Sequence, residues 1–145
     1  MRPIARTAIA ALAAASVVSA GCGDELAEFR DDELRPLERR ADAQRAQLAA
    51  TLEVVEAGSA RHARVLESQL AALERTFAEL AELDPPGDLD ETYARFVAAN
   101  EAFTERMHSF IDALRRGDGK SMKTTAESAK EAVGAAQRAI QPLHE

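Results

Sequence analysis

Residues 89–114 repeat an apolar or aromatic side chain every three or four positions, and this spacing restricts the fold more than any other feature. Residues three and four apart share one face of an α-helix, whereas a β-strand would scatter them over both faces. Tyr93 and three of the five phenylalanines lie on this face. The segment therefore predicts a long amphipathic helix that is the most buried of the chain. Its positions are Leu89, Tyr93, Phe96, Asn100, Phe103, Met107, Phe110 and Leu114.

Three further segments carry the same spacing and predict three more amphipathic helices. In the segment 34–55 the polar Gln44 occupies a seam position, and in the segment 122–143 most seam residues are small. Together they predict an all-α fold, an antiparallel three- to four-helix bundle over residues 34–145 with coiled-coil-like heptad packing. The seams are Leu34, Leu37, Ala41, Leu48, Leu52 and Val55; Ala63, Leu66, Leu70, Leu73, Phe77 and Leu80; and Met122, Ala126, Ala129, Val133, Ala136, Ile140 and Leu143.

Proline and glycine mark the expected ends of these helices. The run Asp84-Pro85-Pro86-Gly87 predicts a firm corner, because a proline disfavours helix in the residue before it. The run Gly117-Asp118-Gly119 predicts a second stop. Pro36 is expected in a first helical turn, where its missing N–H costs nothing, and Pro142 is expected to end the last helix.

Two boundaries depend on capping residues. Asp88 is expected to cap the helix that follows the proline corner, with Glu91 three residues later completing a capping box. Gly58 is expected to follow the first helix and Ser59 to cap the second. Because the apolar seam nearly keeps its phase through Ser59, a single helix over residues 34–83 remains the alternative to two helices, 34–57 and 60–83.

The N-terminal region has the pattern of an export signal. Arg2 and Arg6 are followed by an uncharged stretch of about twelve residues, too short to cross a bilayer of ~30 Å. Small residues then precede Cys22, the only cysteine. This region resembles the signal peptides of bacterial lipoproteins, although Ser19 stands where that family usually has leucine. The resemblance implies that residues 1–21 are removed and that Cys22 carries two acyl chains.

The lipoprotein resemblance implies where the protein resides. It predicts a lipid-attached tether over residues 22–33 and a domain held on the extracytoplasmic face of the cell membrane. The alternative is an ordinary secretory signal, cleaved after Ala20 or Gly21, that leaves Cys22 as a free thiol. An exported chain with one unpaired cysteine is unusual, which favours lipidation. Two acyl chains also give a stable anchor where one would be marginal.

The charge of the chain limits its partners. The formal net charge is −7 and the isoelectric point is about 5.1. An acidic chain is not expected to bind nucleic acid, nor to dock on anionic lipid through a basic surface. We therefore expect attachment to the membrane through the acyl chains on Cys22 alone, with an envelope protein as a possible partner. The sequence does not define the oligomeric state.

A second resemblance covers residues 66–120. It rests on the run Leu80-Ala81-Glu82-Leu83-Asp84-Pro85-Pro86, on the following Leu89, Tyr93 and Phe96, and on Leu114-Arg115-Arg116-Gly117-Asp118. This pattern is similar to that of uncharacterised exported helical proteins from GC-rich bacteria. The resemblance implies a helical bundle and assigns no activity.

Residues that could bind a metal or a haem are scattered. The histidines His62, His108 and His144 are far apart in the sequence and have no cysteine partner for a zinc site. Glu105 and His108 have the Glu-x-x-His spacing of di-metal bundles, but such a site needs the motif on two helices. Met107 could ligate haem, but its seam position favours core packing. We expect no metal and no cofactor.

Two other features have a structural and a functional interpretation. Asn100 lies at a seam position among aromatic residues, where a buried polar group can fix helix register or contact a ligand. Lys120, Lys123 and Lys130 follow Arg115 and Arg116 in the sequence. They predict a solvated helix face, or a surface for an acidic partner or for cell-wall phosphate polymers.

No nucleophile elbow and no phosphate-binding glycine loop occur in the sequence. We therefore expect no catalytic residues and no enzymatic activity. The sequence predicts a lipid-anchored extracytoplasmic bundle with a non-catalytic binding or structural spacer role. The alternative is a sensory bundle that binds a small molecule or haem between its helices.

Overall fold

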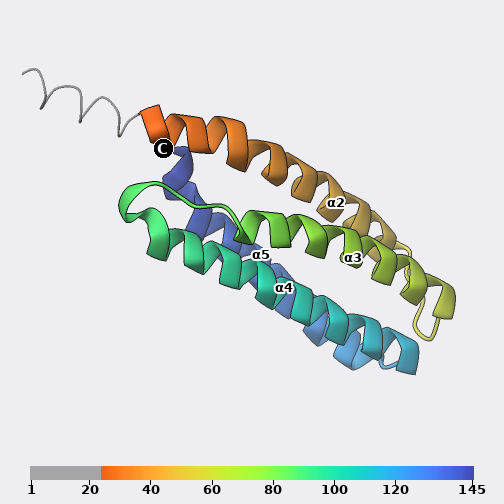
Figure 1. Ribbon diagram of the computed structural model, residues 1–145. Helices are drawn as coiled ribbons and strands as arrows, with labels where there is room; N and C mark the ends of the chain where they lie inside the picture. The colour runs from red at the N-terminus through yellow and green to blue at the C-terminus, as the bar shows by residue number, and fades with distance from the viewer. Residues whose placement is uncertain (1–23) are drawn as a thin grey trace, which may run out of the picture.

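The computed structural model describes residues 24–145, and in that range it contains four long helices and no strand. Short connections join successive helices, so that each runs antiparallel to the one before it (Figure 1). The predicted all-α bundle is confirmed in its four-helix form. The helices are α2 (Arg35–Glu53), α3 (Ala60–Ala81), α4 (Asp90–Arg116) and α5 (Gly119–His144).

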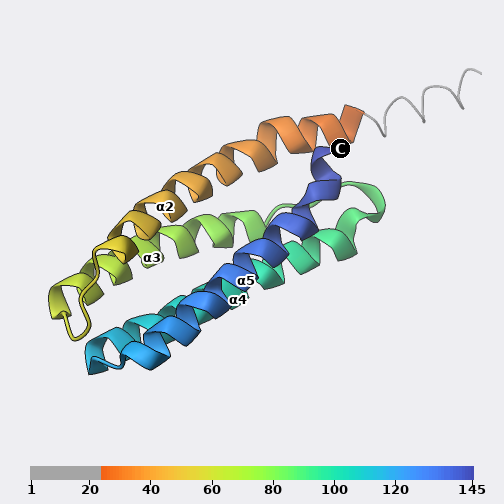
Figure 2. The same cartoon turned by 180° about the vertical axis from the view of Figure 1, so that it is seen from behind.

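The α2–α3 and α4–α5 turns lie at one end of the bundle, which we call the turn end. The α3–α4 connection, the start of the described chain and the C-terminus lie at the other (Figures 1 and 2). At the turn end, the Gly58 N–H donates to the carbonyl of Leu114 at 2.7 Å. Gly58 and Gly117 have φ values of +82° and +69°, which side chains rarely adopt. The two turns are therefore fastened to one another by backbone contact.

The helices do not pack equally closely. The helices α4 and α5 approach each other along most of their length, as the small seam residues of α5 predict. The helix α2 packs mainly on α3, and its close approaches to α5 are sparse. The seam between α2 and α5 is consequently the loosest in the bundle.

The predicted seams form the core. Every predicted seam position of α3 is buried, as are those of α4 from Tyr93 to Leu114. The first and last helices bury their seams less completely, since Leu52, Val55, Met122, Ala126 and Val133 are only partly covered. Within the four long helices, the sequence pattern did not single out four further buried residues, Thr76, Ile111, Ala113 and Ala132.

The bundle begins before the predicted boundary at Leu34. Residues 24–28 are helical and continue through a π-helical turn, η1 (Phe29–Leu34), into α2. Phe29 is only 3% exposed, and its ring contacts the Tyr93 ring edge-on, with 5.9 Å between the ring centroids. The predicted tether over residues 22–33 is thus corrected for the residues described: Phe29 belongs to the core.

The π-helical turn explains how Pro36 is accommodated within a longer helix. A proline ring clashes with the carbonyl four residues earlier, so an uninterrupted α-helix would be kinked there. Here the Arg35 N–H donates to the carbonyl of Arg30, five residues back, which widens the turn just before the proline. Pro36 lies in the first turn of α2, as predicted, but that turn follows other helical residues.

The predicted break between the first two helices is confirmed, although its position differs. The helix α2 ends at Glu53, well before Gly58, and Ser59 caps α3 by accepting a hydrogen bond from the His62 N–H at 3.2 Å. The stop at residues 117–119 is also confirmed. Asp118 caps α5 through the Ser121 N–H, and hydrogen bonds from Ser121 hold the pKa of Asp118 below its usual value.

Two predicted helix ends are wrong. Asp88 does not cap α4 but lies inside a 3-10 turn, η2 (Gly87–Leu89), and the residue before α4 makes no side-chain capping bond. The glycine of the corner, at φ +67°, starts a tighter turn that takes the place of the capping box. Pro142 does not end α5, which continues to His144.

The hydroxyl of Tyr93 gives the bundle a testable response to alkaline pH. It donates to the Leu80 carbonyl at 2.5 Å, and burial raises its pKa above the usual 10.0, with the charges of Glu38 and Glu33 adding to the rise. The folded state thus retains a proton that the unfolded state releases. We expect stability to be complete below pH 10.0 and to fall as the pH rises further. Urea unfolding measured from pH 9 to 11 should show a shallower decline in Tyr93→Phe, which cannot ionise; parallel declines would contradict this account.

Candidate functional site

A cleft runs along the loose seam between α2 and α5. It has two parts, which share three lining residues, Asp42, Arg45 and Gln137. We name the part nearer the helical turns the turn half and the part nearer the chain ends the terminal half. Their volumes are about 440 and 330 Å3 respectively, within the range of small-molecule sites.

The floor of the turn half is aromatic and apolar. Phe103, Met107 and Phe110 project from successive turns of α4, because their spacing places them on one face of that helix. Small side chains on α2 and α5 form the walls, and the floor beneath them is almost fully covered, with Phe103 at 7% the most exposed of the three. The remaining lining residues of the turn half are Asp42, Arg45, Ala46, Ala49 and Leu52 on α2 and Ala126, Ala129, Lys130, Val133 and Gln137 on α5.

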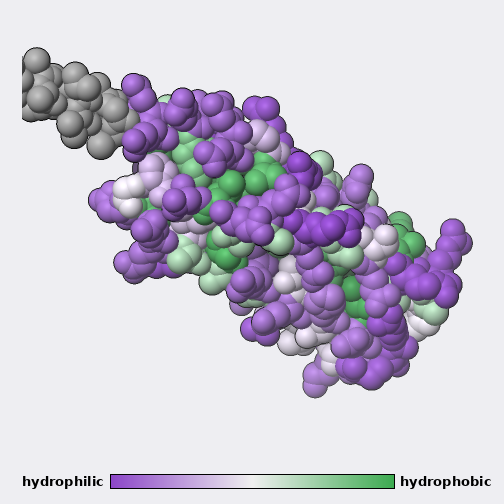
Figure 3. Space-filling model, viewed as in Figure 1, coloured by the Kyte–Doolittle hydropathy of each residue, from purple (hydrophilic) through white to green (hydrophobic). Residues whose placement is uncertain are grey.

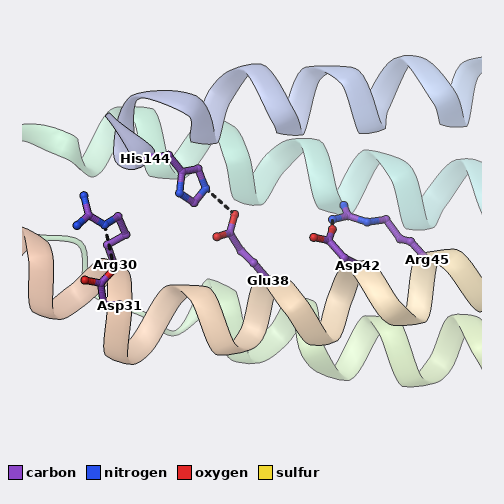
Figure 4. A network of polar contacts seen from close by, with 6 residues as sticks. All are labelled: Arg30, Asp31, Glu38, Asp42, Arg45 and His144. Carbon is purple, nitrogen blue, oxygen red and sulfur yellow. Dashed lines mark hydrogen bonds and ion pairs between the residues drawn. The ribbon is translucent and has the colours of Figure 1, made fainter.

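The terminal half is more polar at its rim. Its floor consists of Phe77, Leu80 and Phe96, and its rim carries the carboxylate of Glu38 and the imidazole of His144. The two rim groups lie 3.1 Å apart and join α2 to α5 across the cleft (Figure 4). This contact connects the last residues of α5 to the first turn of α2.

Polar side chains narrow the cleft at its middle, which we call the waist: Asp42, Arg45 and Gln137. Figure 4 shows Glu38, Asp42 and Arg45 projecting from the same side of α2. The guanidinium of Arg45 pairs with the carboxylate of Asp42, and its side chain is 21% exposed. The side chain of Arg45 is therefore largely covered and lines both halves of the cleft. Its guanidinium has further N–H donors beyond the one that binds Asp42.

Asn100 lies on α4 between Phe96 and Phe103, which belong to the floors of the two halves. The side chain is 3% exposed, and its Nδ2 has no hydrogen-bond partner in the described part of the chain. A polar pair between α2 and α3 is self-contained, because the Thr76 hydroxyl donates to Gln44 at 2.7 Å. Asn100 lines neither half of the cleft, so its unpaired amide donor belongs to the core of the bundle.

The three histidines lie apart and have separate partners. The Nδ1 of His62 accepts from the Glu56 N–H at 3.1 Å, and the Nε2 of His108 lies 2.5 Å from Glu74. His144 pairs with Glu38, as described above. Within residues 24–145, no group of three or more histidine, cysteine or acidic residues is arranged to hold a metal ion.

The basic residues between Arg115 and Lys130 lie on two helices and do not form one surface. Lys120, Lys123 and Lys130 are all exposed, but only Lys130 lines the turn half. Arg115 instead pairs with Glu67 on α3. Met107 is 1% exposed and packs in the core, as its position in the sequence predicted, while also contributing to the floor of the turn half.

The sequence did not predict the cleft, although one pattern pointed to it. Ala46 and Ala49 lie on α2 outside its main seam, and with the alanines of α5 they leave two helices with facing short side chains. Cys22, the predicted lipidation site, and the predicted signal segment 1–21 lie outside the described residues.

Comparisons with known proteins give no family for the chain. No protein family, no curated protein and no solved structure matches it. In the described range, every helix is too short or too polar to cross a membrane.

Proposed function

We propose that this protein is a lipid-anchored extracytoplasmic helical bundle that binds a ligand without catalysis, and that the α2–α5 cleft is its binding site. The cleft is the observation that carries the binding role. A bundle that served only as a spacer would gain stability by closing this seam, because burial of the partly covered apolar walls, Leu52 and Val133 among them, is favourable. The spacer role therefore ranks second.

The lipoprotein signal pattern supports the anchor. Cys22 precedes Asp24, where the described helix begins, and Phe29 is already packed in the core. Acyl chains on Cys22, of the palmitate type, would therefore hold the terminal end of the bundle close to the bilayer. The net negative charge provides no attraction to anionic lipid, so the anchor must supply the membrane attachment.

The composition of the cleft supports an organic ligand over the haem alternative. Met107 belongs to the floor of the turn half, and none of the residues lining that half is a histidine. A haem iron held there would lack the Met–His pair that the alternative requires. The proposal also includes coiled-coil-like packing within the bundle, which the three- and four-residue spacing of α3 and α4 supports.

Replacing Cys22 tests the anchor. We expect Cys22→Ser to be exported but not acylated, because the serine hydroxyl cannot form the thioether of a lipoprotein. In detergent phase partitioning, the wild-type protein should enter the detergent phase and the variant should stay in the aqueous phase. Aqueous partitioning of both proteins would contradict the lipid anchor.

A further inference from the structure

We propose that the turn half of the cleft binds a long-chain carboxylate, with the alkyl chain over the floor of α4 and the carboxylate beside Arg45 and Lys130. This inference rests on the proposed binding role and specifies its ligand. It follows from two properties of the cleft, its apolar lining and its local charge.

The floor favours an alkyl chain. Phe103, Met107 and Phe110 form a continuous apolar strip along α4, and the walls add Leu52 and Val133. The strip follows the long axis of the helix, so its shape suits an extended chain. Met107 suits a flexible apolar ligand, because its unbranched thioether side chain is polarizable and can fill irregular gaps. Each methylene placed here leaves water, which supplies the main driving force for binding.

The charge around the turn half favours an anion. Two cationic side chains, Arg45 and Lys130, line this half, against one carboxylate, that of Asp42. Lys130 has no acidic partner within ion-pair distance in the range 24–145. A local excess of positive charge therefore occurs in a chain whose net charge is −7. An anionic head group complements this excess, whereas a cationic head group would meet two like charges.

The surroundings of the cleft favour a small amphiphile over a protein partner. Figure 3 shows the opposite face of the bundle, with α3 in front, where hydrophilic side chains cover most of the surface and hydrophobic residues are visible mainly in narrow strips. In the described part of the chain, the only exposed large hydrophobic residues are Val54 and Val65, neither of which lines the cleft. A stable protein interface would need about 800 Å2 of surface on each partner, with an apolar centre.

Calorimetric titration of the exported chain carrying Cys22→Ser tests this ligand without competition from attached acyl chains. We expect one dodecanoate to bind per chain, with affinity rising up to about fourfold for each methylene added from hexanoate upward. Dodecyltrimethylammonium, with a similar chain and a positive head group, should bind more weakly than dodecanoate. Equal binding of the two amphiphiles would overturn the charge argument.

Charge reversal on α5 locates the head group. Lys130→Glu should weaken dodecanoate binding about tenfold and reverse the preference between the two amphiphiles. Lys123→Glu is the matched control, because Lys123 is exposed on the same helix and does not line the cleft. Both sites are exposed, so neither substitution threatens folding. Loss of affinity in both variants alike, or in neither, would overturn the assignment of the head group.

The methionine methyl groups locate the alkyl chain. The protein has three methionines, and of the two in the described range, Met107 lines the turn half and Met122 does not. In carbon-13 methyl spectra, dodecanoate should shift the Met107 signal and leave that of Met122 in place. A shift of Met122 alone, or no binding at all, would overturn the proposal.

Two further outcomes distinguish carboxylate binding from dimerisation through the cleft and from failure of the lipid anchor. A concentration-dependent dimer in sedimentation, with the Met107 shift occurring on dimerisation, would place a second copy of the chain in the cleft and overturn the carboxylate. Because the titration uses unacylated protein, its failure does not affect the lipid anchor, which phase partitioning tests alone. Failure of the anchor likewise leaves the titration valid.

Discussion

Phe103→Ala is expected to lower the free energy of unfolding by about 3–5 kcal/mol, a large part of the stability of a domain this size. Phe103 is 7% exposed and lies in the middle of α4. Its ring contacts the ring of Phe77 edge-on, with 6.3 Å between centroids, so the truncation also removes an aromatic pair between α3 and α4. Urea unfolding followed by circular dichroism measures the loss.

Val133→Ala provides the comparison for this prediction. Val133 is only partly buried, and it faces Phe103 across the cleft from α5. Its truncation should cost about 1 kcal/mol, the value of the methyl groups removed from a half-covered site. Comparison of the two substitutions thus separates the stability that the floor of the cleft contributes from the stability that its wall contributes. Equal losses would show that α4 is not the central helix.

The central helices were predictable because their local pattern and their burial agree. In α3 and α4 the seam repeats every three or four residues without a gap, and every predicted position from Ala63 to Leu80 is buried. The proline corner between them is also decided locally, since Pro85 and Pro86 restrict the backbone whatever surrounds them. Where short-range physics determines an element, the sequence is sufficient to place it.

The exact helix ends were less predictable because neighbouring elements compete with local caps. Gly58 was expected directly after the first helix. Its N–H instead donates to the carbonyl of Leu114, in the last turn of α4. Asp88 has the side chain of a good cap, yet a 3-10 turn places it before the helix that it was expected to start. These choices depend on contacts between segments that are far apart in the sequence.

The candidate site was predictable only in its parts. Met107 was recognised as a seam residue, and Lys130 as part of a basic helix face. Their relation depends on how far α2 lies from α5, and no local pattern sets that distance. The small seam residues of α5 predicted a close approach to its neighbours; α4 makes that approach and α2 does not.

The start of the domain was misplaced because Phe29 stands almost alone in an acidic stretch. Leu26 and Ala27 are the only other apolar residues between Gly23 and Glu33, too few to establish a helical period. The burial of Phe29 depends on Tyr93, more than sixty residues later, whose ring it meets edge-on. A single aromatic residue can thus extend a domain boundary when its partner is distant in sequence.

Phe29→Ala tests that boundary and should cost about 3 kcal/mol, because a ring only 3% exposed is removed from the core. Its edge-on contact with Tyr93 is lost as well, so the alkaline decline in stability should begin from a lower level in this variant.

Glu28→Ala is the matched control, since Glu28 is exposed on the same stretch of helix and alanine favours helix. The control should change stability by less than about 0.5 kcal/mol. If Phe29→Ala is as mild as the control in urea unfolding, residues 24–33 act as a tether after all, and the bundle starts at Leu34. If it is costly, the helix that begins at Asp24 belongs to the bundle, and an anchor at Cys22 would lie two residues before it.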